Sequence, residues 1–169
     1  IRSQVQSFIM ATVMITALMI VLLRGFRIGM LIMLPNLLPI FITYGCMGWW
    51  GIRLDWLTAV VGVSSLGVAV DSTIHIGHRY REARLAGLDA AEAVRKTMMA
   101  IGRPVLYTAA VLIAGFSVVA PSVLLSFSCF GLLMALCLFF ALVADLFWTP
   151  AVLILFAPEV VAEVVEPTP

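Results

Sequence analysis

Long apolar runs, separated by short groups of charged residues, dominate the pattern of this chain. The hydrocarbon core of a bilayer is about 30 Å thick, so a spanning α-helix needs roughly 20 mostly apolar residues. Stretches that meet this requirement cover residues 5–23, 30–50, 56–76, 104–120 and 124–156. The pattern therefore predicts an all-α bundle of five membrane-spanning helices.

Prolines modify two of these predicted spans. The second carries Pro35, Asn36 and Pro39, which predicts a kinked helix with locally freed backbone groups. The last run is longer than one bilayer requires and is interrupted by Pro150. We therefore expect its final turns to leave the membrane.

Residues 78–102 have a different pattern from the apolar runs, because arginines and glutamates alternate here with leucines and methionines. Gly87 is placed to end one helix, and Asp89 followed by Glu92 resembles a capping box that opens the next. The segment is typical of an amphipathic helix on the cytoplasmic surface of the membrane. A solvated connecting helix is the alternative.

Basic residues gather in two connections that five spans place on the same side of the membrane. They are Arg24 and Arg27 in one, and Arg79, Arg81, Arg84, Arg95, Lys96 and Arg103 in or beside the other. Positively charged loops stay in the cytoplasm, so the N-terminus is predicted to face outward and the C-terminus inward. Aromatic residues that suit the outer interface gather on the opposite side: Trp49, Trp50 and Trp56.

The domain organisation follows from these patterns. We expect one transmembrane domain over residues 1–157 and an acidic, disordered cytoplasmic tail over residues 158–169. The odd number of spans, and an opening at Ile1 without a methionine, lead us to expect that the chain is a piece of a longer protein.

Composition excludes several classes of function. With 63% hydrophobic and 11% charged residues, a soluble domain of 169 residues could not bury its apolar surface. A net charge of +1 does not suggest a nucleic-acid partner, and three cysteines in apolar runs predict buried thiols without disulfides. The sequence has no Walker A loop, no metal-spaced ligand cluster and no supported Ser–His–Asp arrangement. It therefore predicts no enzyme, no cofactor and no metal.

The third predicted span carries a carboxylate inside the membrane. Asp71 stands roughly 12 Å along the helix from Arg79, too deep for its short side chain to reach the interface. Small and polar residues at helical spacing share its face: Ser64, Gly67, Asp71, His75 and His78. Intramembrane carboxylates are costly and usually functional, so Asp71 is the candidate group for taking up and releasing protons.

Each of the neighbouring polar residues has two interpretations. His75 is a proton relay or a packing histidine, and Thr108 either donates to the Asp71 carboxylate or bonds its own helix. Asp71 itself could stay protonated and hold helices together. Asp145 is interpreted as structural, satisfying backbone groups that Pro150 frees, and a functional intramembrane carboxylate is the alternative.

Three sequence segments resemble motifs of one transporter superfamily. They are LPNLLPI at Leu34–Ile40, GVAVDSTIHIGHRYRE at Gly67–Glu82 and ADLFWTPAVL at Ala144–Leu153. Their order and separation resemble the resistance-nodulation-division (RND) superfamily, in the lipid-exporter branch related to mycobacterial MmpL and hopanoid transporters and, more distantly, to Patched-type proteins. In these segments Pro35, Asn36, Pro39 and Gly67 form a candidate helix-packing motif.

The resemblance implies a protein of twelve helices in two repeated halves, each with a large external domain. This chain would supply helices eight to twelve and the C-terminal half, in a bacterial inner membrane. Asp71 would match the proton-coupling carboxylate of helix ten, with Ser72, His75 and Thr108 as hydrogen-bond partners. Relatives often carry a second acid where this chain has Ser72, so the chain departs from the family pattern at this position.

The implied function is proton-driven export of a lipid-like or hydrophobic substrate, such as a hopanoid or a sterol. The implied partners are membrane lipids, protons, the N-terminal half with its periplasmic domains, and a second copy in a homo-oligomer. Two alternatives stay open: a protein-export accessory of the SecDF kind, and a sterol-sensing regulatory domain that binds lipid without pumping. The segment at Leu34–Ile40 favours the lipid-exporter branch.

Overall fold

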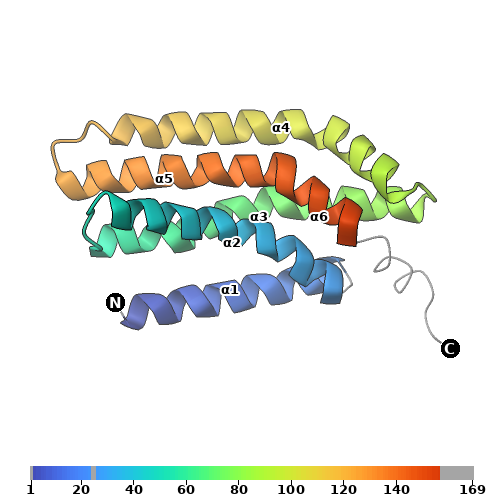
Figure 1. Ribbon diagram of the computed structural model, residues 1–169, viewed down its shortest axis with the longest axis horizontal. Helices are drawn as coiled ribbons and strands as arrows, with labels where there is room; N and C mark the ends of the chain where they lie inside the picture. Colours follow the sequence, from blue (N-terminus) through green and yellow to red (C-terminus); the bar gives the residue numbers. More distant parts are fainter. Residues whose placement is uncertain (1, 24–25, 157–169) are drawn as a thin grey trace.

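The computed structural model describes residues 2–23 and 26–156, which form antiparallel helices running back and forth along one axis (Figure 1). The helices are α1 (Arg2–Leu23), α2 (Phe26–Trp49), α3 (Trp56–Leu85), α4 (Ala90–Val119) and α5 (Leu125–Val143), with η1 (Ala144–Trp148) and α6 (Thr149–Phe156) continuing the last one. Five of the helical stretches in this described part are long and apolar enough to cross a membrane. The predicted all-α bundle of five spans is confirmed.

Local sequence explains where α3 begins. The Thr58 backbone N–H donates to Asp55 Oδ1 at 2.7 Å, and the Asp55 N–H donates to Thr58 Oγ1 at 2.9 Å. This reciprocal capping box satisfies two backbone donors that a helix start leaves free. It fixes the turn between α2 and α3, in which Gly51 adopts a φ of 66°.

The segment over residues 78–102 does not form a helix of its own, which corrects the expected separate helix, while its position at the cytoplasmic membrane surface stays a prediction. Its first residues are the last turns of α3 and its remainder is the start of α4. The two helices continue because their inward faces are buried in the core, through Tyr80 and Ala83 on α3 and Ala93 and Val94 on α4. Leu85 and Met99 stay exposed on the outside of these turns.

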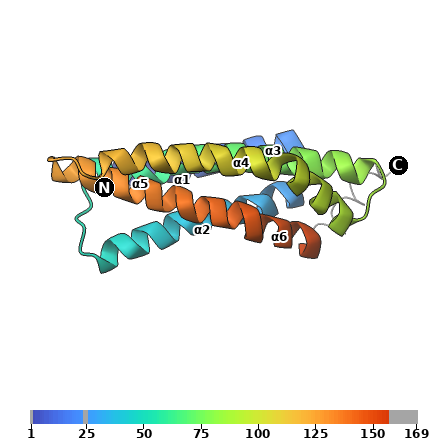
Figure 2. The same cartoon turned by 90° about the horizontal axis from the view of Figure 1, so that it is seen from above.

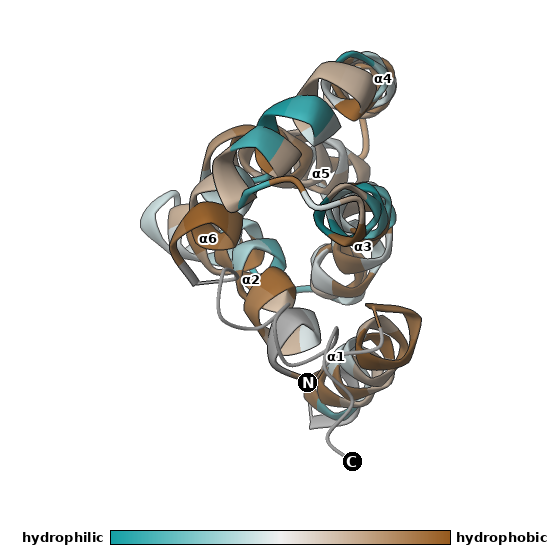
Figure 3. Cartoon of the chain, turned by 90° about the vertical axis from the view of Figure 1, so that its right-hand side faces the viewer, coloured by the Kyte–Doolittle hydropathy of each residue, from teal (hydrophilic) through white to brown (hydrophobic). Residues whose placement is uncertain are grey.

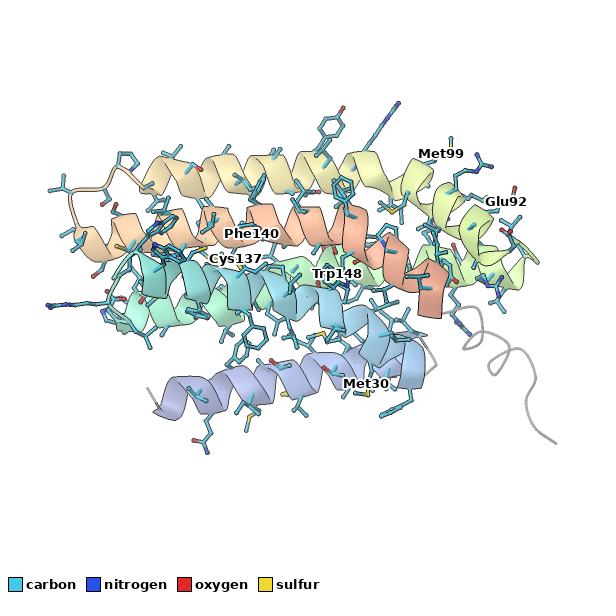
Figure 4. The ribbon with its side chains drawn as sticks, viewed as in Figure 1. Met30, Glu92, Met99, Cys137, Phe140 and Trp148 are labelled. Carbon is cyan, nitrogen blue, oxygen red and sulfur yellow. The ribbon has the colours of Figure 1, made fainter. Side chains whose placement is uncertain are left out.

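The predicted signals at the turn itself are present. Gly87 has a φ of 86°, a left-handed conformation that favours glycine, and the Glu92 N–H donates to Asp89 Oδ1 at 2.7 Å. Beyond the turn, Glu92 and Met99 lie on the outside of α4 (Figure 4). Seen from above, α4 bends along its length (Figure 2), and it contains Pro104, which is a known cause of helix kinks.

The core lies between α2, α3 and α5, with α4 packed on α3 and α5 and α1 packed on α2 and α3. The view along the bundle shows this arrangement, with α1 at one edge (Figure 3). Large apolar side chains fill the centre, among them Ile32, Leu66, Ile76, Leu133 and Leu153. The outer faces of α1 and α4 carry exposed apolar residues, as expected for helices that meet lipid.

The ends of the bundle match the predicted up-and-down order. The connections after α2 and after α4 lie at one end, and the turn between α3 and α4 lies at the other (Figure 1). Trp49, Trp50 and Trp56 are all exposed at the first end. Arg24 and the acidic tail at 158–169 lie outside the described residues, and the orientation of the bundle in a membrane stays a prediction.

Candidate functional site

A polar groove of about 570 Å³ lies between α3 and α4. Its lining includes the four residues that the sequence nominated for proton coupling, Asp71, Ser72, His75 and Thr108. Asp71 and His75 lie on one face of α3 because they are four residues apart. Ser72, three residues before His75, borders that face, and Thr108 approaches from α4. The structure therefore brings these four side chains to one place.

Asp71 is the most unusual of them, because its side chain is 79% exposed within a helix that is long and apolar enough to span a membrane. The nearest titratable partner is His75, one turn away and itself 67% exposed, whose Nε2 lies 3.9 Å from Asp71 Oδ1. That separation is too long for a hydrogen bond. A carboxylate facing hydrocarbon costs several kcal/mol, so this face requires a polar covering.

Thr108 bonds its own helix, which is the second of the two interpretations that the sequence left open. Its hydroxyl donates to the carbonyl of Pro104, four residues earlier on the same helix. The described hydrogen bonds do not join it to Asp71. Thr108 thus borders the groove while its proton is used within α4, the common arrangement for a threonine in an apolar helix.

Charged residues close the end of the groove nearest the turn. The Arg79 guanidinium donates to Glu82 Oε2 at 3.2 Å, and His78 Nδ1 lies 3.6 Å from Glu82 Oε1. All three side chains are about half exposed or more. Polar residues of α3 and α4 gather at this end in the axial view (Figure 3), where the helices emerge from the apolar part of the bundle.

A second polar cluster, which sequence reasoning did not assemble, lies in the core. Thr73 Oγ1 on α3 is 2.9 Å from Asn36 Oδ1 on α2 and 3.1 Å from Asp145 Oδ1 on η1. All three residues are buried. Asp145 therefore bonds a side chain of another helix, whereas the sequence suggested that it would satisfy backbone groups near Pro150.

The helix that carries Asp145 is locally wider than an α-helix. Residues Ala144–Trp148 form a π-helical turn, and the Thr149 N–H donates to the Ala144 carbonyl five residues earlier. Such turns insert an extra residue and are frequent at functional sites. Pro150, which lacks an N–H, follows at once and removes one ordinary helical hydrogen bond.

The candidate packing motif divides into two parts. Pro35, Asn36 and Pro39 are buried, and Asn36 joins α2 to the core cluster. Gly67 is exposed, and a Cβ atom placed there would meet nothing within 4 Å. Because Gly67 shares the outward face of Asp71, no helix in the described part of the chain packs against it.

The core cluster and the groove both reach one small cavity of about 70 Å³. Asp71, Ser72 and Thr108 line it from the groove, and Asp145 lines it from the core. The sequence could reveal the groove side of this cavity, because Asp71 lies at helical spacing from other polar residues. The contribution of Asp145 depends on how η1 packs against α3, and in the sequence it appears only as a carboxylate within an apolar run.

Five antiparallel apolar helices, with polar side chains gathered between them, define a multi-pass membrane protein. The chain belongs to the MMPL family, whose family model matches residues 2–167. This membership confirms the resemblance that the three sequence segments carry.

Two relatives extend the comparison. The membrane protein MJ1562 of Methanocaldococcus jannaschii is 32% identical over 153 residues, which are 89% of this chain and 39% of that protein. The trehalose monomycolate exporter MmpL3 of Mycolicibacterium smegmatis is 40% identical over 55 residues, which are 32% of this chain and 5% of the exporter. The chain thus spans about two fifths of the first relative and a small part of the second.

Proposed function

We propose that this chain is the C-terminal transmembrane half of an RND-type exporter, in which proton movement through Asp71 drives the transport of a lipid-like molecule. The observation that carries the proposal is the exposed Asp71 carboxylate in the middle of an apolar, membrane-length helix. Charged side chains at that depth almost always face a pathway or a partner.

The surroundings of Asp71 suit proton transfer. Ser72 and His75 lie beside it in a groove large enough to hold water, and both side chains can donate and accept hydrogen bonds. Protonation would remove the charge on Asp71, and deprotonation would restore it. A change of one charge in a low-dielectric groove alters how α3 packs against its covering helices, and such shifts can drive larger rearrangements.

The N-terminal half of the transporter is the proposed cover for this face. It would hide Asp71 and Gly67 from lipid and supply the periplasmic domains that select the substrate. The proposed substrate class, a lipid-like molecule, is supported by family membership and by the relative that is an exporter of trehalose monomycolate. A hopanoid or a sterol is the substrate we propose, in a bacterial inner membrane with the C-terminus in the cytoplasm.

The decisive experiment measures lipid efflux by the whole transporter in membrane vesicles, with and without a proton gradient. Asp71→Asn should abolish the gradient-dependent part of the efflux, because an amide cannot take up and release a proton in this way. Glu92→Gln is the matched control, since it makes the same change at an exposed acid outside the groove. Gradient-dependent efflux at the wild-type rate in Asp71→Asn would contradict the proposal.

A second candidate function is lipid sensing, which one observation favours. An apolar groove of about 700 Å³ lies between α1, α2 and the start of α3, and Phe8, Phe41, Tyr44 and Trp56 line it. Its size and composition suit a sterol or an acyl chain. Photocrosslinking of a sterol probe to this groove, in a protein that shows no net lipid flux, would favour sensing over export.

A further inference from the structure

We propose that Asp145 is a second proton-binding carboxylate, connected to Asp71 through the 70 Å³ cavity between α3, α4 and the α5–η1 helix. The inference rests on the proposed function, because it extends the proton path that begins at Asp71. It assigns a role to a buried acid that the groove alone does not use.

The first argument is that the Thr73 hydroxyl has fewer hydrogens than it has acceptor oxygens around it. Its hydroxyl oxygen lies within hydrogen-bond distance of three oxygens, Asn36 Oδ1 at 2.9 Å, the Ala69 carbonyl at 3.1 Å and Asp145 Oδ1 at 3.1 Å. One hydroxyl has one hydrogen and can donate to only one of them. The cluster therefore has room for another proton, and a protonated Asp145 can place that proton between its own oxygen and Thr73.

The same geometry accommodates both states of Asp145. When Asp145 is ionised, the Thr73 hydroxyl donates to the carboxylate. When Asp145 is protonated, it donates to Thr73, whose hydroxyl turns toward the Ala69 carbonyl or the Asn36 amide oxygen. A small rotation of one hydroxyl thus serves both states without moving a helix, which is what a reversible proton-binding site needs.

The second argument is burial. Asp145 is only 3% exposed, and the described residues place no lysine, arginine or histidine within ion-pair distance of it. One turn further on lies Thr149, which is fully buried and whose hydroxyl is beside the Asp145 carboxyl group. A permanent charge without a counterion would be costly here, whereas an acid that exchanges a proton can be neutral in one state.

The third argument is the cavity. A volume of about 70 Å³ holds roughly two water molecules, since each occupies about 30 Å³ in the liquid. Water in a cavity needs two to four polar partners, and Asp71, Ser72, Thr108 and Asp145 supply them. Among the described residues, Asp71 and Asp145 are the only titratable ones in its lining, and apart from Thr108 the α4 and α5 walls are apolar.

The proposed step is a proton transfer and needs no other reactant. The acid proton of Asp71 passes to water in the cavity, the water passes a proton to the Asp145 carboxylate, and Asp71 is left ionised. Thr73 then stops donating to Asp145 and turns to its other acceptors. Asn36 is one of these acceptors and lies between the two prolines of α2. The protonation state of Asp145 on η1 therefore affects a hydrogen bond to α2.

The test measures proton flux in proteoliposomes that contain the whole transporter and a pH-sensitive dye. Asp145→Asn should reduce the flux to the background of empty liposomes, and Asp145→Glu should restore part of it. Asparagine keeps a hydrogen-bonding group beside Thr73, so a merely structural Asp145 would leave the flux unchanged in this variant. Wild-type flux in Asp145→Asn would overturn the inference.

A second pair of variants tests the cavity without touching either carboxylate. Ala109 lines the cavity, and Ala109→Leu should fill it and slow proton flux by roughly tenfold or more, a modest loss for a proton-transfer step. The matched control is Ala110→Leu, because Ala110 is the next residue on α4, is exposed and lies outside the cavity lining. Equal flux in the two variants would contradict a path through the cavity.

Infrared spectroscopy reads the proton on Asp145 directly. Difference spectra of the purified transporter between acidic and neutral pH should contain a protonated-carboxyl band that survives in Asp71→Asn and disappears in Asp145→Asn. A spectrum unchanged by Asp145→Asn would overturn the inference, whether or not the variant transports.

The outcomes separate the two proposals. Blocked flux in Asp71→Asn, with normal flux in Asp145→Asn and Ala109→Leu, would sustain the proposed function and reject the second carboxylate. Normal flux in Asp71→Asn would reject the role of Asp71 and, with it, the link between the two acids.

Discussion

Gly131 on α5 lies directly against the backbone of α4 at Phe116. A Cβ atom at Gly131 would lie 2.8 Å from the Phe116 carbonyl oxygen and 3.0 Å from the Ala120 nitrogen. Both neighbours are backbone atoms, so neither can turn aside as a side chain would. Close approach of helices at small residues is a major source of stability within membranes.

Gly131→Ala should therefore push α4 away from α5. Overpacking of this kind typically costs about 1–3 kcal/mol, and the expected result is a lower free energy of unfolding of the whole protein in detergent. Gly115→Ala on α4 is the control, because a Cβ atom there meets nothing within 4 Å. That control should be neutral or slightly stabilising, since alanine favours a helix more than glycine does. Equal stability of the two variants would contradict the close contact.

Thr73→Val should destabilise the bundle, because it removes the hydroxyl that lies between Asn36 and Asp145 while preserving the side-chain shape. Leaving buried polar groups without a partner costs about 1–3 kcal/mol. Thr73→Ser keeps the hydroxyl and should retain most of the stability. Thermal unfolding in detergent compares the three proteins, and a Val variant as stable as wild type would show that the cluster contributes little.

Asp55 makes the start of α3 sensitive to acid. The Ser126 hydroxyl beside it, and then the Thr58 backbone N–H, hold the pKa of this carboxyl below its usual value. A lowered folded-state pKa means that the stabilisation is complete above the unfolded pKa of about 3.9. It is lost as the pH falls through the lower folded-state value.

Unfolding should therefore become easier below about pH 4, and Asp55→Ala should weaken this acid dependence. The variant should also lose about 1 kcal/mol of stability at neutral pH, as expected for a missing helix cap. Thermal unfolding across the acid range measures both effects. An acid dependence that is identical in wild type and Asp55→Ala would assign it to other carboxylates.

Much of the fold could be predicted from local patterns. Hydropathy alone located the first two spans within a few residues, because a helix in lipid must be apolar over a fixed length, whereas α3 and α4 extend well beyond the predicted 56–76 and 104–120. The turn at Gly87 and the cap at Asp89 could also be predicted, since each depends only on neighbouring residues. The shared helix face of Asp71 and His75 followed from their spacing, whereas Ser72 was named only through the family resemblance.

Relationships between helices were the part that the sequence did not reveal. Thr73, Asn36 and Asp145 lie on three different elements, and no local spacing predicts which faces of those elements meet. The continuous α3 and α4 were missed for a related reason. The charges after His78 indicated a surface helix, whereas the buried faces around Tyr80 and Val94 hold these turns to the core.

The length of the hairpin formed by α3 and α4 has a practical consequence. Each helix has 30 residues and so extends about 45 Å, whereas the hydrocarbon core is about 30 Å thick. The tip around Gly87 should project into the aqueous phase, where an epitope or a reactive label can be attached without entering the bundle. A label at Ala86 that is reached only after cells are permeabilised would place this tip in the cytoplasm, and labelling of intact cells would reverse the predicted orientation.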